Sequence, residues 1–381
     1  MSGAAPGNSL RATGYQPVEF LTLQELPERA RMNLADTAWD YLAGAAETET
    51  TYLRNRMALD SLAFRPRVCR DVAKVDVTGS FLGRKLRLPV FLAPIGSLES
   101  FAAGGGVAAA QGAEAFGVDH MLSSVTQPDL ETVAGNVKQA TLFQLYVRGD
   151  DAFVDGYVAR AVDAGFRAFA ITVDTAHYSR RERDIIKRYL PAGRARGVNR
   201  TGHNWQMSFN WDNVKRFKDK HTIPLILKGI ATAEDAATAV EHGVDCIYVS
   251  NHGGRQLDYG RGAIEVLPEV VAAVGGKAEI AIDGGFCRGT DIVKAMILGA
   301  DAVGLGRMHG YALAAGGAAG VRRMLELLER ECEIALGLLG VQRFADLDQS
   351  YLTAGTPAYP PGPFAAFPHL HWPRHNERRD R

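Results

Sequence analysis

A histidine and an arginine follow directly after a short apolar run of the chain. The run, Cys246–Val249, is typical of a strand buried on both faces, and the string Ser-Asn-His-Gly-Gly-Arg occupies positions 250–255. Histidine can exchange a proton near neutral pH, and arginine can pair with a carboxylate. The two glycines allow a sharp turn and leave space for a ligand. We therefore expect His252 and Arg255 to lie where parallel α/β folds keep their chemistry, the alternative being a structural histidine and a surface arginine.

Eight short apolar runs alternate with helical stretches from Pro89 onward, and this pattern predicts where His252 lies in the fold. The runs are Val90–Pro94, Met121–Val125, Leu142–Tyr146, Phe169–Asp174, Leu225–Gly229, Ile247–His252, Ile280–Gly285 and Val303–Gly306. Helical patterns between them, such as 152–164, 233–242 and 290–298, end at Gly165, Gly243 and Gly299. This order predicts an α/β fold, a closed (β/α)₈ TIM barrel. An open doubly wound sheet is the alternative, which the lack of a Gly-x-Gly-x-x-Gly turn after an early strand argues against.

The remaining segments flank or interrupt the predicted barrel domain, residues 23–353. Residues 1–22 are rich in Gly, Pro and Ala and are expected to form a flexible arm, followed by a helical pattern over 23–46. Residues 175–224 form a long polar insertion after the fourth strand, which we interpret as a mobile active-site lid. Its basic and aromatic residues are Arg180, Arg181, Arg183, Arg194, Arg196, Arg200, His203 and Trp205. Residues 354–381 are rich in proline and are predicted to be an extended tail that needs a neighbouring subunit to cover it.

The carboxyl ends of the predicted strands carry polar, charged and glycine residues that are unusual in a hydrophobic core. Because these ends meet at one mouth of a barrel, we expect the side chains there to form a site. Asp283-Gly284-Gly285 and Gly306-Arg307 follow the last two strands, the usual phosphate site of such barrels. The alternative is a pair of tight turns with a surface arginine. Lys228 would be a buried cation without a partner unless an anionic group lies beside it.

Several strings at these ends resemble, in order, the FMN-dependent 2-hydroxy acid oxidase and dehydrogenase family. That family includes glycolate oxidase, lactate oxidase, lactate monooxygenase and mandelate dehydrogenase. The resemblance extends from about Leu26 to Leu352. The strings are Phe-Gln-Leu-Tyr, Thr-Val-Asp-Thr, Leu-Lys-Gly, Ser-Asn-His-Gly-Gly-Arg-Gln-Leu-Asp, Asp-Gly-Gly and Leu-Gly-Arg.

The resemblance implies an FMN cofactor and a role for each strand end. The residues implied for FMN are Pro94, Ile95, Gly96, Ser123, Gln144, Thr172, Lys228, Ser250, Asp283, Gly284, Gly285, Phe286, Cys287, Gly306 and Arg307. Those implied for the substrate are Tyr41, Tyr146, Arg181, His252 and Arg255. His252 would be the base, oriented by Asp174, with Tyr146 and Arg255 completing the catalytic group. These roles suit the chemistry, because oxidising a 2-hydroxy acid requires a base for a proton and a cation for the carboxylate.

Two departures from the family concern the size of the substrate pocket. Gly96 stands where many relatives have alanine, and Val125 stands where glycolate oxidase has tryptophan. Both changes are expected to enlarge the pocket. We therefore expect a bulky or aromatic substrate of the mandelate type, the alternative being that a residue of the insertion, such as Tyr178 or Trp205, fills the space.

Two further departures concern the cofactor and the first tyrosine. Cys287 stands where an arginine often lies in the phosphate loop, so Arg307 is expected to carry more of the phosphate. Leu42 replaces the second tyrosine of a common pair, which leaves Tyr41 as the candidate ligand.

The expected reaction is oxidation of an (S)-2-hydroxy acid to the 2-oxo acid, with dioxygen reduced to hydrogen peroxide. A monooxygenase that decarboxylates the oxo acid, a non-redox phosphate-binding aldolase or isomerase, and a catalytically silent binding protein are the alternatives. We expect a homotetramer.

Composition excludes several other classes of protein. The 43 basic residues equal the 43 acidic ones, so nothing calls for nucleic acid or an anionic membrane surface. The four cysteines match no zinc or disulfide spacing, and no metal is expected. There is neither a signal-peptide pattern nor an apolar run of about 20 residues, so a cytoplasmic protein without a membrane segment is expected.

Overall fold

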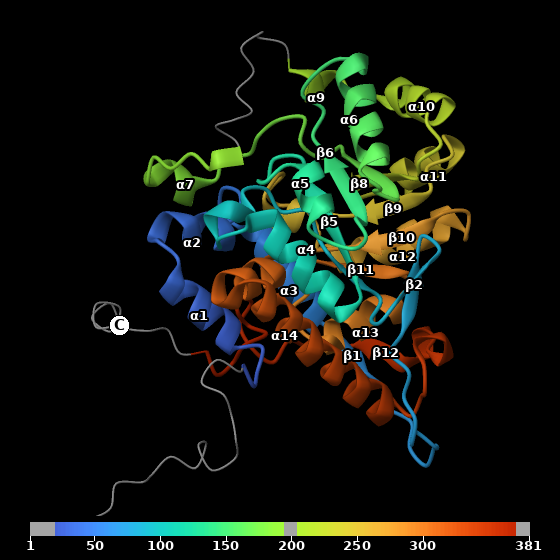
Figure 1. Ribbon diagram of the computed structural model, residues 1–381. Coiled ribbons are helices and arrows are strands. Elements are labelled where there is room, and N and C mark those ends of the chain that lie inside the picture. Colours follow the sequence, from blue (N-terminus) through green and yellow to red (C-terminus); the bar gives the residue numbers. More distant parts are fainter. Residues whose placement is uncertain (1–19, 194–203, 371–381) are drawn as a thin grey trace, which may run out of the picture.

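Eight parallel strands close into a barrel in the order of the sequence. The computed structural model describes residues 20–193 and 204–370 (Figure 1). The strands are β4 (Val90–Leu92), β5 (Asp119–Ser123), β6 (Leu142–Leu145), β7 (Ala168–Thr172), β8 (Leu225–Ile230), β9 (Cys246–Val249), β10 (Glu279–Ile282) and β11 (Ala302–Leu305). β11 pairs with β4, with Val303 opposite Val90, and closes the sheet. The predicted TIM barrel is confirmed, and all eight strands lie where the apolar runs predicted them.

A hairpin closes the amino end of the barrel and leaves the carboxyl end for a site. It consists of β2 (Gly79–Phe81) and β3 (Arg84–Leu86). Phe81 is fully buried and stacks on Phe91 of β4 at 5.4 Å between ring centroids. Side chains that fill the barrel interior, such as Met121 and Ile226, belong to the same apolar cluster. The interior is therefore a packed core and not a pore, as in other barrels of this kind.

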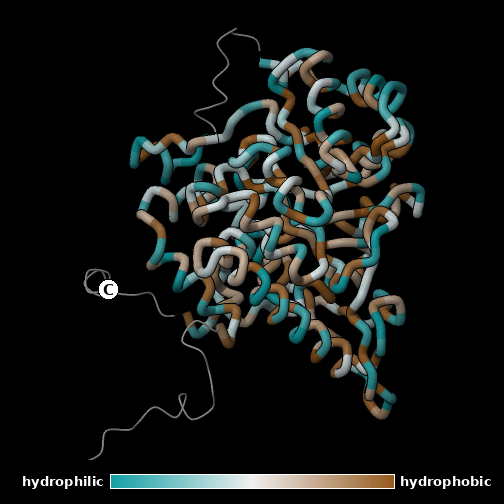
Figure 2. The backbone as a smooth tube through the Cα atoms, in the orientation of Figure 1, coloured by the Kyte–Doolittle hydropathy of each residue, from teal (hydrophilic) through white to brown (hydrophobic). Residues whose placement is uncertain are grey.

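Helices form the outer layer around the strands. They are α4 (Gly105–Phe116), α5 (Leu130–Gly135), α6 (Asp151–Asp163), α10 (Trp211–Lys220), α11 (Ala233–Glu241), α12 (Ala263–Val274), α13 (Gly289–Ile297) and α14 (Arg307–Leu339). Asp150 and Thr232 cap α6 and α11 with their side chains, and Gly165 and Gly243 follow these helices in the left-handed conformation. Figure 2 shows hydrophobic and hydrophilic stretches alternating along α14, which has one face toward the barrel.

The amino-terminal segment contains three helices. They are α1 (Glu25–Asn33), α2 (Asp36–Ala43) and α3 (Thr50–Asp60). The single helical stretch expected over 23–46 is therefore wrong: the backbone is extended at Leu34 and Ala35 and separates two helices. Beyond α3, β1 (Leu62–Phe64) pairs with β12 (Leu352–Ala354), which ties the two ends of the domain together.

The insertion after β7 begins at the mouth of the barrel. It contains α7 (Glu182–Ile186), α9 (Trp205–Ser208) and then α10. The Gly193 amide donates to Ser97 Oγ at 2.7 Å, so this part of the insertion covers the mouth beside β4. The predicted lid residues Arg194, Arg196, Arg200 and His203 lie outside the described residues. A mobile lid stays a prediction.

The carboxyl-terminal tail packs on its own chain as far as it is described. Residues 355–370 contain neither helix nor strand. Phe364 stacks on Trp39 with 6.1 Å between centroids, and Phe367 is buried. The expectation that the tail needs a neighbouring subunit is wrong for this part, because aromatic residues of α2 and α14 cover it. Residues 371–381, like most of the predicted flexible arm (1–19), lie outside the described residues.

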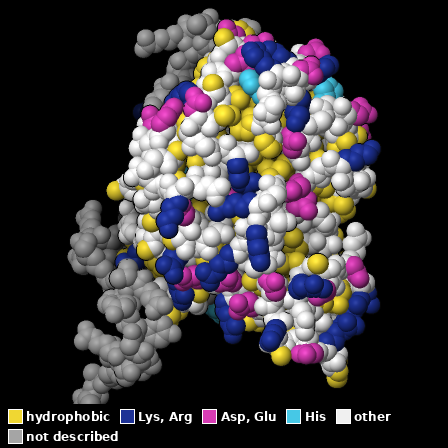
Figure 3. Space-filling view, turned by 45° about the vertical axis from the view of Figure 1, so that its right-hand side comes forward, with side chains coloured by type: hydrophobic (Ala, Val, Ile, Leu, Met, Phe, Trp, Pro, Cys, Tyr) yellow, Lys and Arg dark blue, Asp and Glu magenta, His cyan; other side chains and the backbone are white. Residues whose placement is uncertain are grey.

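Charge and hydropathy of the described residues agree with the composition. Among the helices in residues 20–193 and 204–370, none has the length and apolar character needed to cross a bilayer. Figure 3 shows basic and acidic side chains interspersed on the face in view. The same part of the chain contains no cluster of three His, Cys, Asp or Glu suited to a metal.

Two buried histidines make the fold sensitive to acid. His120 of β5 and His309 of α14 lie edge to face with centroids 5.9 Å apart. His120 Nε2 has no hydrogen-bond partner among the described residues, and the His309 ring interacts with backbone groups of Ala93 and Leu305. Burial lowers the pKa of each from 6.5 to about 3. The folded state therefore binds fewer protons than the unfolded state between these values, and stability falls as the pH drops through this range.

We expect each buried histidine to cost about 2 kcal/mol of stability at pH 5 relative to pH 8. In urea unfolding of the apoprotein at a series of pH values, His120→Phe should lose less stability than the wild type between pH 7 and pH 4. The exposed His369 serves as a control, and His369→Gln should follow the wild-type slope. An unchanged slope in His120→Phe would show that His120 is not the group that titrates.

Candidate active site

A cavity of about 140 Å³ opens at the carboxyl ends of the strands. Most residues predicted for the site line it: Tyr41, Pro94, Ile95, Gly96, Tyr146, Arg181, Lys228, His252, Arg255, Asp283, Gly284, Gly285, Phe286, Cys287, Gly306 and Arg307. The other five do not line it but are buried or nearly so among these residues: Ser123, Gln144, Thr172, Asp174 and Ser250.

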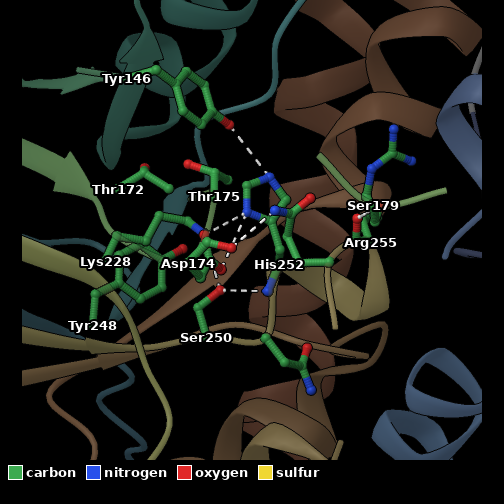
Figure 4. A network of polar contacts seen from close by, with 12 residues as sticks. Tyr146, Thr172, Asp174, Thr175, Ser179, Lys228, Tyr248, Ser250, His252 and Arg255 are labelled. Carbon is green, nitrogen blue, oxygen red and sulfur yellow. Dashed lines mark hydrogen bonds and ion pairs between the residues drawn. The ribbon is translucent and has the colours of Figure 1, made fainter. Parts of the chain in front are cut away.

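His252 lies between a carboxylate and a phenol at the end of β9. Its Nδ1 is 3.0 Å from Asp174 Oδ1, and its Nε2 is 3.3 Å from the Tyr146 hydroxyl (Figure 4). The Ser250 hydroxyl accepts a hydrogen bond from the His252 backbone amide at 3.0 Å. His252 and Gly253 have φ of 57° and 63°, a left-handed turn that a non-glycine residue rarely adopts. This turn directs the imidazole into the cavity.

The hydrogen bonds define which ring nitrogen can act as the base. An ionised Asp174 only accepts, so in the neutral imidazole Nδ1 carries the proton and Nε2 keeps a lone pair facing the cavity. Burial lowers the pKa of His252, and Lys228 adds to this effect, whereas Asp174 opposes it. Burial also disfavours ionisation of Asp174, but the charges of His252 and Lys228 outweigh it and lower the pKa of Asp174. His252 is therefore neutral, and able to accept a proton, at neutral pH.

Lys228 has an anionic partner within the protein. Its Nζ donates to Ser250 Oγ at 3.0 Å and lies 3.8 Å from Asp283 Oδ2. Asp283 also accepts from Ser250 Oγ at 2.6 Å and from the Tyr248 hydroxyl at 3.0 Å. The anionic group expected beside Lys228 is thus supplied by Asp283, because β8 and β10 flank β9 and bring the two charges together. Lys228 still lines the cavity, where its charge can stabilise a developing anion.

Three polar side chains connect the ends of β5, β6 and β7. The Ser123 hydroxyl donates to Gln144 Oε1 at 2.7 Å, and Gln144 Nε2 donates to Thr172 Oγ1 at 2.8 Å. All three are buried, so each hydrogen bond is made in a low-dielectric environment. The row fixes the Gln144 amide beside the cavity without exposing it.

Two arginines, Arg181 and Arg255, face the same space, which the carboxylate of Asp184 also lines. Arg255 Nη1 donates to the carbonyls of Tyr41 and Gly44 at 2.5 and 3.0 Å, and its guanidinium lies over the Tyr41 ring. Burial lowers the pKa of Arg255 to about 9, and the like charge of Arg181 contributes. A bound carboxylate would relieve this repulsion, since it would pair with both guanidinium groups.

The contact between Gly96 and Val125 changes the expected pocket size. A Cβ at position 96 would lie 2.7 Å from Val125 Cγ2 and 3.7 Å from the Tyr41 hydroxyl. The valine methyl therefore occupies the space that an alanine at position 96 would need. The expectation that both changes add volume is wrong. Tyr178 of the insertion also lines the cavity, whereas Trp205 lines a separate hollow beside Val147.

The glycine turn after β10 lies at the other end of the cavity. Gly284 and Gly285 have φ of 112° and 86°, and a Cβ on Gly284 would come within 2.9 Å of Asn55 Oδ1. Arg307, the first residue of α14, donates to the carbonyls of Gly253 and Gly44 at 2.8 and 2.7 Å. Backbone amides, a helix N-terminus and an arginine thus meet here, as an anion requires.

Sequence reasoning missed several side chains that line the cavity, among them Tyr52, Arg148, Asp184 and Tyr311. Arg148 donates to the Tyr178 hydroxyl at 2.8 Å and could have been found, because it lies three residues beyond the end of β6. Tyr311 lies one helical turn after Arg307 and so shares its face of α14. Tyr52 lies on α3, outside the strand ends, and no sequence signal indicates it.

Comparison with known proteins agrees with this arrangement. Residues 30–354 match the family described as FMN-dependent dehydrogenase. The chain is 37% identical to the L-lactate oxidase of Nostoc sp. over 356 residues, which cover 87% of this chain and 98% of that protein. It is 37% identical to glycolate oxidase 3 of Arabidopsis thaliana over 363 residues, 90% of this chain and 99% of that one. A crystal structure of mandelate oxidase superimposes with a TM-score of 0.81 at 36% identity and covers 89% of this chain and 100% of its own.

The cavity fits the cofactor of these relatives. At one end, Arg307 Nε is buried without a hydrogen-bond partner among the described residues, and the Tyr311 hydroxyl has none at full hydrogen-bond geometry, so both could donate to a bound anion. At the other end, Lys228 lies beside His252, where a ring that gains negative charge would be stabilised. The chain belongs to the family of FMN-dependent 2-hydroxy acid oxidases and dehydrogenases, and FMN is its cofactor.

Proposed function

We propose that this enzyme oxidises an (S)-2-hydroxy acid to the 2-oxo acid and that dioxygen accepts the two electrons, giving hydrogen peroxide. The observation that carries the proposal is the position of His252 Nε2, which faces a cavity with two arginines while Asp174 holds Nδ1. Lactate oxidase and glycolate oxidase among the relatives support dioxygen as the acceptor.

The side chains that line the cavity have different roles toward the substrate. Arg181 and Arg255 bind the carboxylate, which fixes the orientation of C2. His252 Nε2 accepts a proton from the substrate, and Asp174 stabilises the imidazolium that forms. Burial raises the pKa of Tyr146, so its hydroxyl stays protonated and donates to an oxygen of the substrate or to His252.

The strand ends hold the cofactor. Pro94–Gly96, Lys228 and the turn 283–287 would hold FMN, which when bound accepts the two electrons that leave C2 of the substrate.

Measuring hydrogen peroxide and carbon dioxide per substrate oxidised tests the acceptor. We expect about one peroxide per 2-oxo acid and no carbon dioxide, because a true oxidase releases both products intact. Carbon dioxide in place of peroxide would make the enzyme a monooxygenase. Turnover that needs another electron acceptor would overturn the role of dioxygen. The FMN dependence of the family is not compatible with the non-redox alternative.

We further propose a bulky or aromatic substrate of the mandelate type. Val125 is smaller than the tryptophan of glycolate oxidase, and several mandelate oxidase structures superimpose on this chain, one of them solved with (S)-mandelic acid. An aryl group in this space would gain about 25 cal/mol per Å² of buried apolar surface.

The measurement compares kcat/KM for glycolate, lactate, 2-hydroxyoctanoate and mandelate. The value is expected to be highest for mandelate or 2-hydroxyoctanoate. Val125→Trp should then suppress the larger substrates selectively and spare lactate, because the indole would fill the apolar end of the pocket. Val137→Trp, a change at a partly buried valine in the loop after α5 and outside the cavity, serves as a control for general damage. Glycolate as the best of the four substrates would contradict the proposed size class.

The assembly and location are proposals as well. We propose a cytoplasmic homotetramer, supported by two exposed apolar residues close to the catalytic turn, Leu257 and Tyr259, and by four free cysteines.

A further inference from the structure

The cavity end beside the glycine turn lacks the cation that the family often has there. Cys287 occupies the position of the usual arginine and is buried, and burial raises the pKa of its thiol to about 12. The side chain is therefore a neutral thiol. A phosphate bound at this end must find its donors elsewhere.

Two neighbouring arginines do not replace the missing one, because carboxylates already pair with them. Arg56 Nη1 lies 2.7 Å from Asp291 Oδ2, and its Nη2 lies 2.6 Å from Asp60 Oδ1. Arg288 Nη2 lies 2.6 Å from Glu331 Oε1. Among the described residues that line this end of the cavity, Arg307 is the cation left without a carboxylate.

Two tyrosine side chains occupy the space around Arg307. The Arg307 guanidinium lies over the Tyr52 ring, 3.9 Å from its centroid, and both Tyr52 and Tyr311 line the cavity. The hydroxyls of Tyr52 and Tyr311 interact with each other, but the buried Tyr311 hydroxyl has no partner at full hydrogen-bond geometry among the described residues, and the same holds for Arg307 Nε. Leaving such donors unsatisfied costs free energy, so a ligand is expected to meet them.

The surroundings hold these phenols in place and keep them protonated. The Tyr311 ring stacks on Trp39 with centroids 5.5 Å apart and packs against Phe364 of the tail at 6.1 Å. Burial raises the pKa of Tyr52 and of Tyr311. Both hydroxyls therefore remain donors at neutral pH, which suits an anionic acceptor.

We propose that the hydroxyls of Tyr52 and Tyr311 donate hydrogen bonds to the phosphate of FMN, in place of the arginine that Cys287 replaces. The proposal rests on the FMN dependence of the family and adds two cofactor ligands that lie on helices α3 and α14. The glycine turn and the N-terminus of α14 supply backbone amides to the same phosphate. Recognition of the phosphate thus depends on one cation and two neutral donors.

Titration of the apoprotein with FMN and with riboflavin, followed by quenching of flavin fluorescence, tests the proposal. Riboflavin lacks the phosphate, so the ratio of the two dissociation constants isolates the phosphate contacts. Tyr52→Phe and Tyr311→Phe should each weaken FMN binding about tenfold or more, as loss of a hydrogen bond to a charged group does. Binding of riboflavin should stay the same. Tyr351→Phe, at a buried tyrosine that does not line the cavity, should change neither constant.

A rescue variant shows whether the Tyr52 hydroxyl donates a hydrogen bond to the phosphate or only fills space beside it. In the Tyr52→Phe background, Cys287→Arg should restore FMN binding without affecting riboflavin, because it returns a donor to the same place. Equal weakening of FMN and riboflavin by both phenylalanine variants, or no weakening by either, would overturn the proposal. Thermal unfolding of each apoprotein identifies a variant that fails to fold, and the ³¹P chemical shift of FMN bound to Tyr52→Phe then decides. None of these readouts depends on turnover, so their failure would leave the proposed oxidation untouched.

Discussion

Replacing His252 with alanine is expected to slow anaerobic flavin reduction by about two to four orders of magnitude while FMN stays bound. Nε2 of this residue faces the cavity as the lone-pair nitrogen, and the variant removes it without touching the glycine turn that would hold the phosphate. Rapid mixing of the flavoprotein with substrate, followed by the flavin absorbance, measures the rate directly.

The pH dependence gives this prediction a second readout. Because burial lowers the pKa of His252, the acid limb of kcat/KM is expected below the ordinary value of 6.5. The limb should vanish in the alanine variant. His242, a partly buried histidine beside Trp211, provides the matched control, and His242→Ala should reduce its flavin at the wild-type rate. Wild-type rates in His252→Ala would place the base on another residue.

Arg255→Met is expected to cost about 2–5 kcal/mol in kcat/KM for a 2-hydroxy acid. The guanidinium is buried, and the like charge of Arg181 acts on it in the same cavity, so the negative charge of a substrate carboxylate would stabilise it. The matching ester carries no such charge and should lose far less. Comparing the acid and its methyl ester in wild type and variant gives the two ratios.

The control for Arg255 addresses its contacts with the backbone. The same guanidinium donates to the carbonyls of Tyr41 and Gly44, so the substitution also removes two structural hydrogen bonds. A structural role would lower activity toward acid and ester equally, and that outcome would contradict carboxylate binding. Arg261→Met, at an arginine paired with Glu269 outside the cavity, should affect neither substrate.

The barrel and most of the site could be predicted because both follow from local patterns. Strands such as Leu225–Ile230 are apolar and buried along their length, so the sequence reveals them without knowledge of their neighbours. Once eight such strands are in order, their carboxyl ends must meet, which brings His252, Asp174 and Lys228 together.

The features that sequence could not predict depend on contacts between distant segments. The pairing of Lys228 with Asp283 arises only when β8, β9 and β10 lie side by side. Likewise, the Val125 methyl fills the space at Gly96 because β4 pairs with β5. The residue types alone suggested that two smaller side chains would each add volume to the pocket. Tyr52 reaches the cavity from a helix, where no strand end marks it.

Anaerobic mixing of the purified flavoprotein with an (S)-2-hydroxy acid tests the central claim most directly. We expect (S)-mandelate or 2-hydroxyoctanoate to bleach the flavin and to form one equivalent of 2-oxo acid, whereas (R)-mandelate should not. Admitting dioxygen should restore the absorbance with release of peroxide. A flavin that stays oxidised with glycolate, lactate, 2-hydroxyoctanoate and mandelate alike would contradict it.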